Sequence, residues 1–214
     1  PFAIANIPES IDGYPVTEIG ERAFEDTWIG EVTIPNSVKR IGRFAFYNCF
    51  WLTGVHIPAS VEFMEGSSFL NCDDNFDLTV DEGNTFYKII DGNLYSHNGD
   101  RLVWYMGSQS SFTVPSSVNV IGPYAFSDTS LDYIKVPENV VSIEEYGFSM
   151  SGASHIELSE GLISIGDGAF EEGSIFSINI PASVSHIGKD AFRLRGSGAF
   201  TVAEGNQICK SVDG

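Results

Sequence analysis

Basic residues are scarce in this chain of 214 residues: 11 Lys and Arg stand against 29 Asp and Glu, which gives a formal net charge of −18. A protein of this charge repels the phosphates of nucleic acids and the anionic headgroups of a membrane. Long apolar runs are also missing, because none approaches the roughly 18–20 residues that a membrane helix needs. The sequence therefore excludes nucleic acid as a partner and membrane insertion by this segment.

Catalytic and metal-binding motifs are absent as well. The four histidines lie in different segments, and no G-x-S-x-G elbow, Cys–His arrangement or glycine-rich phosphate loop occurs. Acidic groups such as Asp81-Glu82 and Glu171-Glu172 lack the spacing of a calcium loop. The sequence therefore predicts a protein that is not an enzyme and that has no cofactor and no metal site.

What the sequence does contain is a repeat. The phrase IPNSVKRIGRFAFYNC (34–49) returns in related form at 57–72, 114–129, 136–151, 158–173 and 180–195. Most units are 22 or 23 residues long. Each opens with an aliphatic residue: Ile7, Ile34, Ile57, Val80, Val114, Val136, Leu158, Ile180 and Val202. Units this short cannot bury their own apolar face, so they predict a solenoid in which neighbouring coils cover one another.

Each unit follows the same internal plan. Aliphatic residues that alternate with polar ones predict a short strand before the opening residue, and a proline then ends the strand. The glycine of the I-G step, as at Gly42 and Gly166, predicts a bend with positive φ. A small residue followed by phenylalanine completes the unit, and these rings predict one buried stack: Phe24, Phe46, Phe69, Phe126, Phe148, Phe170 and Phe192.

The frame I-P-x-S-V-x-x-I-G-x-x-A-F-x-x-C resembles the BspA-like branch of the leucine-rich repeats, and the resemblance covers essentially the whole chain. It implies a mainly β repeat solenoid, a right-handed coil with a parallel β-sheet on one face. It also implies export to the bacterial cell surface and an extracellular role in adhesion or host-matrix recognition. The sequence departs from the commoner leucine-rich signature because no asparagine ladder follows the strands.

Two units are longer than the rest. The first contains five extra residues, 11–15, whose Asp-Gly pair predicts a surface turn. The unit that opens at Val80 has the hairpin signals Asp91-Gly92 and Asn98-Gly99, which predict an inserted β-meander over about residues 81–110. Its rings are expected to be partly exposed; they form either a secondary ligand-binding patch or the meander's own small core: Tyr87, Tyr95, Trp104 and Tyr105.

Residues 202–214 begin a second copy of that long unit, since VAEGNQICKSVDG matches VDEGNTFYKIIDG. We therefore expect residues 1–214 to form a single solenoid domain excised from a longer protein. The absence of targeting and anchoring signals then carries no information about location. Uncapped coil ends invite association, so an end-to-end dimer is expected to be an artefact of truncation.

Cys49 and Cys72 lie one repeat apart, which places their Cα atoms within the range of a disulfide. Side chains in register point in parallel, however, which favours two buried thiols over a bond. Both alternatives stay open from the sequence.

The candidate binding surface is a set of residues that lie between the two buried aliphatic residues of each strand. This outward column is Thr33, His56, Thr79, Thr113, Lys135, Glu157, Asn179 and Thr201. It is polar and nearly neutral, which suits an extended peptide or glycan, although a solvated sheet would have the same composition. The leading hypothesis is a non-catalytic cell-surface binding or adhesion module for extracellular or host proteins or glycans; the alternative is a passive spacer.

Overall fold

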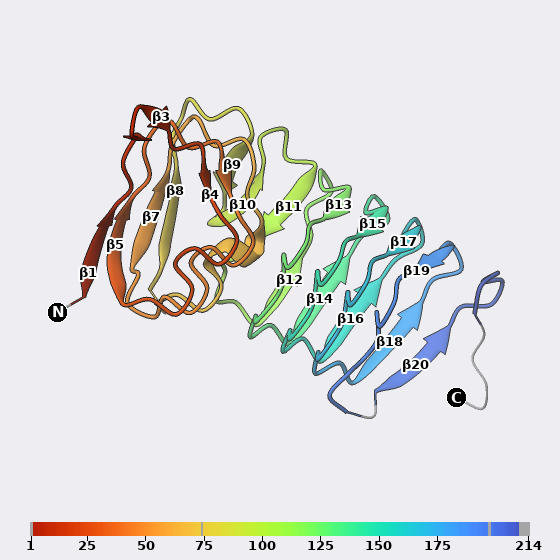
Figure 1. The fold of residues 1–214 in the computed structure, drawn as a ribbon. Helices are drawn as coiled ribbons and strands as arrows, with labels where there is room; N and C mark the ends of the chain where they lie inside the picture. The colour runs from red at the N-terminus through yellow and green to blue at the C-terminus, as the bar shows by residue number, and fades with distance from the viewer. Residues whose placement is uncertain (1, 74, 197, 210–214) are drawn as a thin grey trace. The chain divides into compact units, whose positions relative to one another are not determined.

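A computed structural model describes residues 2–73, 75–196 and 198–209 (Figure 1). Its regular structure is β apart from one short 3-10 helix, and successive repeats form stacked coils, so the predicted β-solenoid is confirmed. The chain divides into two compact units, Pro1–Asn98 and Gly99–Gly214. The prediction of one continuous domain over residues 1–214 stays a prediction.

The first unit is built from short parallel pairs and two hairpins. The parallel pairs are β1 (Ala3–Asn6) with β5 (Ile29–Thr33), β7 (Gly54–Ile57) with β8 (Asp77–Val80), and β4 (Glu18–Ile19) with β6 (Arg40–Ile41). The hairpins are β2 (Ser10–Ile11) with β3 (Tyr14–Pro15) and β9 (Tyr87–Ile90) with β10 (Asn93–Ser96). The 3-10 helix η1 (Gly66–Phe69) replaces the usual turn of one coil.

The second unit has two parallel ladders (Figure 1). One ladder consists of β12 (Ser111–Thr113), β14 (Tyr133–Val136), β16 (His155–Leu158), β18 (Ser177–Ile180) and β20 (Ala199–Val202). The other consists of β11 (Arg101–Trp104), β13 (Val120–Ile121), β15 (Ser142–Ile143), β17 (Ser164–Ile165) and β19 (His186–Ile187). Each strand pairs with its equivalent one repeat away, which is the register that a 22-residue repeat predicts.

The predicted stack of phenylalanine rings is present in both units. Ring centroids lie 5.1 and 5.2 Å apart along Phe24, Phe46 and Phe69, and 4.7, 5.2 and 5.1 Å apart along Phe126, Phe148, Phe170 and Phe192. The rings are nearly parallel, with interplanar angles of 12° or less. The residue before each ring is small, so the backbones of neighbouring coils can approach closely enough for the rings to touch.

The predicted positive φ at the I-G glycines is wrong. The left-handed conformation falls two and six residues later, as at Phe44 (φ 58°) and Asn48 (φ 59°) after Gly42. Glycine is required for a different reason, because a Cβ on Gly42 would lie 2.6 Å from the backbone nitrogen of Glu21 in the neighbouring coil. Close approach of the two backbones therefore selects glycine at position 42.

Replacing Gly42 with alanine is expected to cost about 1–3 kcal/mol, because the added methyl group forces two coil backbones apart. Gly20 occupies the same step of the preceding coil, but a Cβ there meets nothing within 4 Å. Gly20→Ala is therefore the matched control, and it should leave the melting temperature unchanged or slightly raised. Thermal unfolding followed by circular dichroism measures both variants, and equal losses would contradict the steric explanation.

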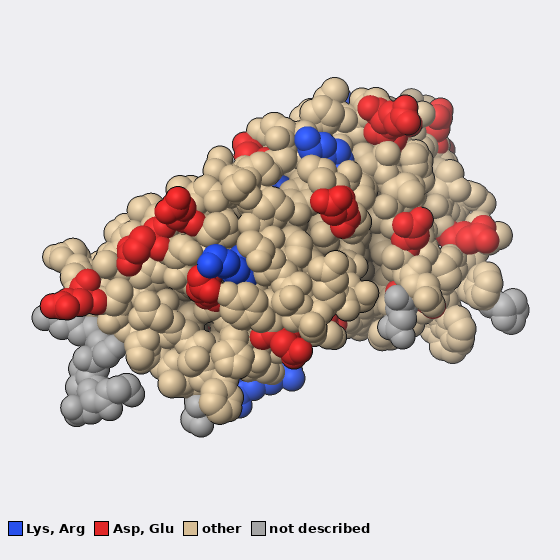
Figure 2. Space-filling view, turned by 180° about the vertical axis from the view of Figure 1, so that it is seen from behind, with Lys and Arg blue, Asp and Glu red and all other residues tan. Residues whose placement is uncertain are grey.

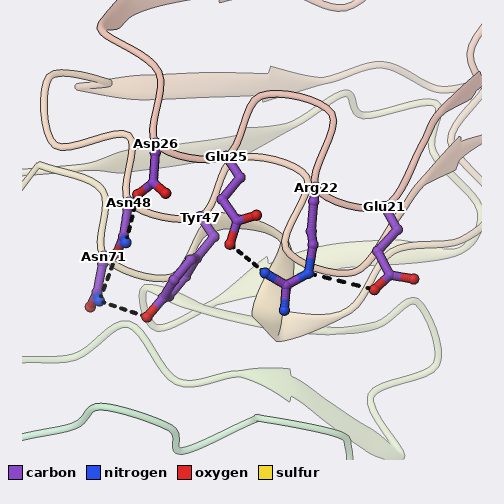
Figure 3. Close-up of polar contacts among 7 residues, drawn as sticks. All are labelled: Glu21, Arg22, Glu25, Asp26, Tyr47, Asn48 and Asn71. Atoms are coloured by element: carbon purple, nitrogen blue, oxygen red, sulfur yellow. Dashed lines mark hydrogen bonds and ion pairs between the residues drawn. The ribbon is translucent and has the colours of Figure 1, made fainter.

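A ladder of polar side chains connects three turns of the first unit (Figure 3). Asn48 Nδ2 donates to Asp26 Oδ1 at 2.9 Å, and Asn71 Nδ2 donates to Asn48 Oδ1 at 3.1 Å. All three residues have φ between 57° and 59°, a left-handed conformation that Asp and Asn adopt more readily than other non-glycine residues. The ladder therefore fixes the turns from which the next strands start.

The predicted insertion is confirmed as a β-hairpin, but it ends earlier than predicted. Asp91 (φ 48°) and Gly92 (φ 74°) form the expected hairpin turn between β9 and β10. Strand β11, however, pairs in parallel with β13, and Leu102 lies opposite Ile121. The chain thus resumes the coil pattern at Arg101, earlier than the predicted end of the insertion at about residue 110.

The predicted exposure of the insertion's rings is wrong for three of the four residues. Tyr87, Tyr95 and Tyr105 are buried, and Trp104 is half-buried. The backbone nitrogen of Tyr105 donates to Ala125 O at 2.8 Å, and its ring stacks on Phe126 with centroids 5.5 Å apart. Tyr105 therefore occupies a phenylalanine position of the core stack. Because these tyrosines pack inside the protein, they cannot form a secondary binding patch.

Residues 202–209 share one structural feature with the start of the long unit at Val80, and the second copy itself stays a prediction. Asn84 and Asn206 are both buried, and each side-chain amide donates to two carbonyl oxygens of the preceding coil. Each side-chain carbonyl accepts from two backbone N–H groups that follow it. The two segments thus begin with a buried asparagine side chain that makes the same four hydrogen bonds. The remaining match, at residues 210–214, lies outside the described residues.

The cysteines are unbonded thiols, so the disulfide alternative is not realised. Cys49 Sγ donates to Phe24 O at 3.1 Å, and Cys72 Sγ donates to Phe46 O at 3.4 Å. The hydroxyl of Thr27, at the same step of another coil, also donates to Phe24 O, at 2.7 Å. Burial raises the pKa of both thiols. Cysteine and threonine therefore share one structural role, which is to bind the carbonyl group of a core phenylalanine.

Candidate functional site

The clearest candidate site is the outward face of the ladder formed by β12, β14, β16, β18 and β20 in the second unit. Alternation along each strand places apolar residues in the core and leaves two outward residues per strand. We define this sheet face by Ser111, Thr113, Tyr133, Lys135, His155, Glu157, Ser177, Asn179, Ala199 and Thr201. Lys135 is half-buried and the others are exposed.

Register brings the predicted outward column together within this unit. Thr113 lies opposite Lys135, Lys135 lies opposite Glu157, and Asn179 lies opposite Thr201. Thr201 Oγ1 donates to Asn179 Oδ1 at 3.0 Å. Side chains from neighbouring coils are therefore aligned along the face, as the sequence predicted.

A charged cluster stands at the centre of the sheet face. Lys135 Nζ donates to Glu157 Oε1 at 2.6 Å, and the Tyr133 hydroxyl donates to Glu157 Oε2. The hydrogen bond from Lys135, followed by that from Tyr133, lowers the pKa of the Glu157 carboxyl. Glu157 in turn raises the pKa of Lys135 and that of Tyr133. The cluster can present a carboxylate, an ammonium and a phenol to one ligand without adding net charge.

The lowered pKa of Glu157 gives a prediction. The contribution of the cluster to stability is present above the ordinary glutamate pKa of about 4.3 and is lost as pH falls through the lowered value. Lys135→Gln should raise the Glu157 pKa towards that ordinary value, as measured by an NMR titration of side-chain carboxyls. Glu160 is an internal control, because backbone N–H groups of Ala182 and Ser183 lower its pKa. Its pKa should not move.

The first unit holds the other three residues of the outward column. Thr33, His56 and Thr79 are all exposed. His56 Nδ1 and Thr79 Oγ1 lie 3.0 Å apart, and His56 Nε2 lies 3.8 Å from Asp81 Oδ2. Beside Thr79 is an open hollow of about 440 Å³, whose lining includes Lys88 and His97. This part of the column is thus polar and has acidic neighbours, unlike the neutral sheet face of the second unit.

Sequence reasoning missed half of the sheet face. Tyr133 and His155 lie opposite each other, two positions before Lys135 and Glu157 on the same strands. The sequence contains the signal for these residues, because the alternation that places Lys135 outward also places Tyr133 outward. The missed residues supply an aromatic ring and an imidazole to the face.

The charge distribution sets the sheet face apart from the rest of the protein. Figure 2 shows acidic side chains spread over one side of the molecule with few basic ones among them. The sheet face instead carries one lysine and one glutamate in contact.

In the part of the chain that the structure describes, no cluster of three or more His, Cys, Asp or Glu side chains could hold a metal ion. Over the same residues, no helix is long and apolar enough to cross a membrane.

Comparison with known proteins agrees with the fold. The fold is similar to that of the pneumococcal vaccine antigen PcpA, with 22% identity over 91% of this chain and 56% of that chain and a TM-score of 0.73. It is also similar to a leucine-rich cell surface protein from Faecalibacterium prausnitzii, with 26% identity over 95% of this chain and 61% of that chain and a TM-score of 0.60. A leucine-rich repeat protein from Eubacterium ventriosum has 21% identity over 93% of this chain and 54% of its own, with a TM-score of 0.59.

The chain thus spans between 54% and 61% of the length of these solved chains. No curated protein matches it. The family model described as a BspA type leucine-rich repeat region matches residues 5–97 and 103–203 in 6 copies. Since the match covers most of the sequence and the coils stack as the repeat requires, the chain belongs to the BspA-type leucine-rich repeat family.

Proposed function

We propose that this chain is a non-catalytic binding segment of a bacterial cell-surface protein, and that the sheet face of its second unit contacts an extracellular protein or glycan. The observation that carries the proposal is the central cluster, in which Lys135, Glu157 and Tyr133 from two adjacent strands bind one another on an exposed surface. Charged groups that are paired on a neutral face can exchange partners with a ligand without an overall charge barrier.

Two further observations support this function. Repeats of this family are generally non-enzymatic scaffolds, and stacked coils offer the broad face that extended partners need. The Faecalibacterium prausnitzii protein of similar fold is described as a cell surface protein, which supports an extracellular location for this chain.

A binding screen against extracellular matrix proteins and glycans tests the proposal. A variant that combines Lys135→Gln and Glu157→Gln should lose at least tenfold in affinity for a ligand found in the screen, with an unchanged melting temperature. The matched control is Lys39→Gln with Glu62→Gln, because these residues form another exposed ion pair between coils, 2.7 Å long, away from the sheet face. Absence of any specific ligand, or equal binding by both variants, would favour a passive spacer.

A further inference from the structure

Three exposed aromatic residues lie in two loops of the first unit that stack one repeat apart. Trp28, Phe50 and Trp51 have exposed fractions of 73%, 59% and 52%. Trp28 directly precedes β5, and the other two precede β7. We call these residues the aromatic edge. Large rings exposed in a group are unusual on a soluble surface and mark sites of interaction.

Hydrogen bonds between the loops align the backbone positions that carry the rings. Asn48 donates to Asp26 (Figure 3), and Thr27 Oγ1 lies 3.4 Å from Cys49 Sγ. The two loops are therefore in register immediately before the aromatic residues. Trp28 therefore follows Thr27 at the position where Phe50 follows Cys49. The register of the coils, and not chance proximity on the surface, creates the aromatic edge.

The loops are rigid supports for these rings. The backbone nitrogen of Leu52 donates to Cys49 O at 2.9 Å, which closes a turn with Phe50 and Trp51 at its two corners. Cys49 and Leu52 are fully buried, so the turn is anchored on both sides. The carbonyl oxygen of Trp28 accepts from Ala3 N at 2.9 Å. Rings held in this way lose little conformational freedom when a partner binds.

The fold itself does not require aromatic residues at these positions. In the second unit, the residue after the equivalent hydroxyl step is small: Ser130 after Thr129, and Gly152 after Ser151. Those coils make the same internal bond, since Thr129 donates to Phe126 O as Thr27 donates to Phe24 O. The rings of the first unit therefore serve something other than packing.

The charges around the aromatic edge are of one sign. The segments that surround it, residues 26–33, 48–57 and 71–80, contain no lysine or arginine. Among the described residues they contain Asp26, Glu31, Asp73 and Asp77. An acidic rim repels anionic glycans and anionic lipid surfaces and attracts basic side chains.

We propose that the aromatic edge binds a protein partner that presents apolar side chains flanked by lysine or arginine. The rings supply the apolar centre of the interface, and the acidic rim pairs with the basic residues around it. This site goes beyond the proposed function, because it is a different surface in a different unit and does not include the sheet face.

Selection of a random peptide display library on the protein tests this proposal. Enriched peptides should combine aromatic or aliphatic residues with lysine or arginine. A synthesised peptide from this set should bind at least tenfold more weakly, by calorimetry, to the Trp28→Ser/Trp51→Ser variant. The binding should also blue-shift the intrinsic fluorescence, because two of the three tryptophans belong to the aromatic edge.

Two control variants separate this site from others. Phe176→Ser removes a ring that is 75% exposed on the loop before β18, outside the aromatic edge, and should leave peptide affinity unchanged. Lys135→Gln with Glu157→Gln disrupts the sheet face and should also leave peptide affinity unchanged. This variant separates failure of the aromatic-edge proposal from failure of the sheet-face proposal. Equal melting temperatures would show that all variants are folded.

Several results would overturn the proposal. They are the absence of enriched peptides, enrichment of acidic peptides, and equal binding to the Trp28→Ser/Trp51→Ser variant. Ring-dependent binding to chito-oligosaccharides or to phosphatidylcholine vesicles, without binding to basic peptides, would assign the aromatic edge to a glycan or a membrane instead.

Discussion

Replacing Phe148 with alanine is expected to lower the free energy of unfolding by about 3–5 kcal/mol. The ring is 0% exposed and lies between Phe126 and Phe170, at centroid distances of 4.7 and 5.2 Å. Hydrogen bonds of 2.7 Å, from Phe148 N to Ala169 O and from Phe126 N to Gly147 O, hold the neighbouring coils at a fixed spacing. The coils cannot close the space left by the ring, so the variant has both a cavity and two neighbouring rings that have each lost one of their two stacking partners.

Phe192→Ala is the comparison that isolates the effect of stacking. Phe192 is half-buried and stacks face to face only on Phe170, since Phe200 meets it edge-on with an interplanar angle of 75°. Its removal should therefore cost clearly less than removal of Phe148 in urea denaturation and in thermal unfolding. Equal losses from the two variants would mean that the rings stabilise the protein individually and not as a stack.

The strands and the phenylalanine stack could be predicted because each depends on residues that recur at a fixed interval. A residue such as Ile156 must meet Ile134 and Ile178, one repeat away on each side, as the paired strands show. A sequence period of 22 thus specifies which residues touch, even though the contacts are distant along the chain. The outward column was predicted for the same reason, since alternation fixes which side chains leave the core.

Predictions from the sequence were wrong where the spacing within a repeat changes, and where a contact between coils is made by backbone atoms alone. Tyr105 follows Leu102 by three residues, whereas Phe126 follows Ile121 by five, so its place in the stack has no sequence signature. At Gly42 the neighbouring atom is the backbone nitrogen of Glu21. Every residue has a backbone nitrogen, so the sequence contains no signal for this contact. The sequence did not predict the aromatic edge because its rings do not recur from repeat to repeat. A comparison of the repeats identifies the residues that they share and ignores residues that occur in only a few of them.

Replacing Asn84 with alanine is expected to cost about 2–4 kcal/mol, because four backbone groups lose a hydrogen bond to a buried side chain. The side-chain amide donates to Pro58 O at 2.9 Å and Val61 O at 3.0 Å, and its oxygen accepts from the N–H groups of Phe86 and Tyr87. The side chain thus connects the last regular coil of the first unit to the start of the β9–β10 hairpin. Amide exchange at Phe86 and Tyr87 should accelerate together with the global loss.

Two further substitutions make this prediction specific to the hydrogen bonds. Asn119 is exposed, so Asn119→Ala should change stability by less than about 0.5 kcal/mol. Asn84→Asp keeps both acceptor bonds but directs a carboxylate at two carbonyl oxygens, and burial raises the pKa of such a group. Its cost should therefore be large at neutral pH and should shrink as pH falls through that raised pKa, where the protonated carboxyl can donate. A cost of Asn84→Asp that does not depend on pH would show that the donor bonds to the preceding coil contribute nothing.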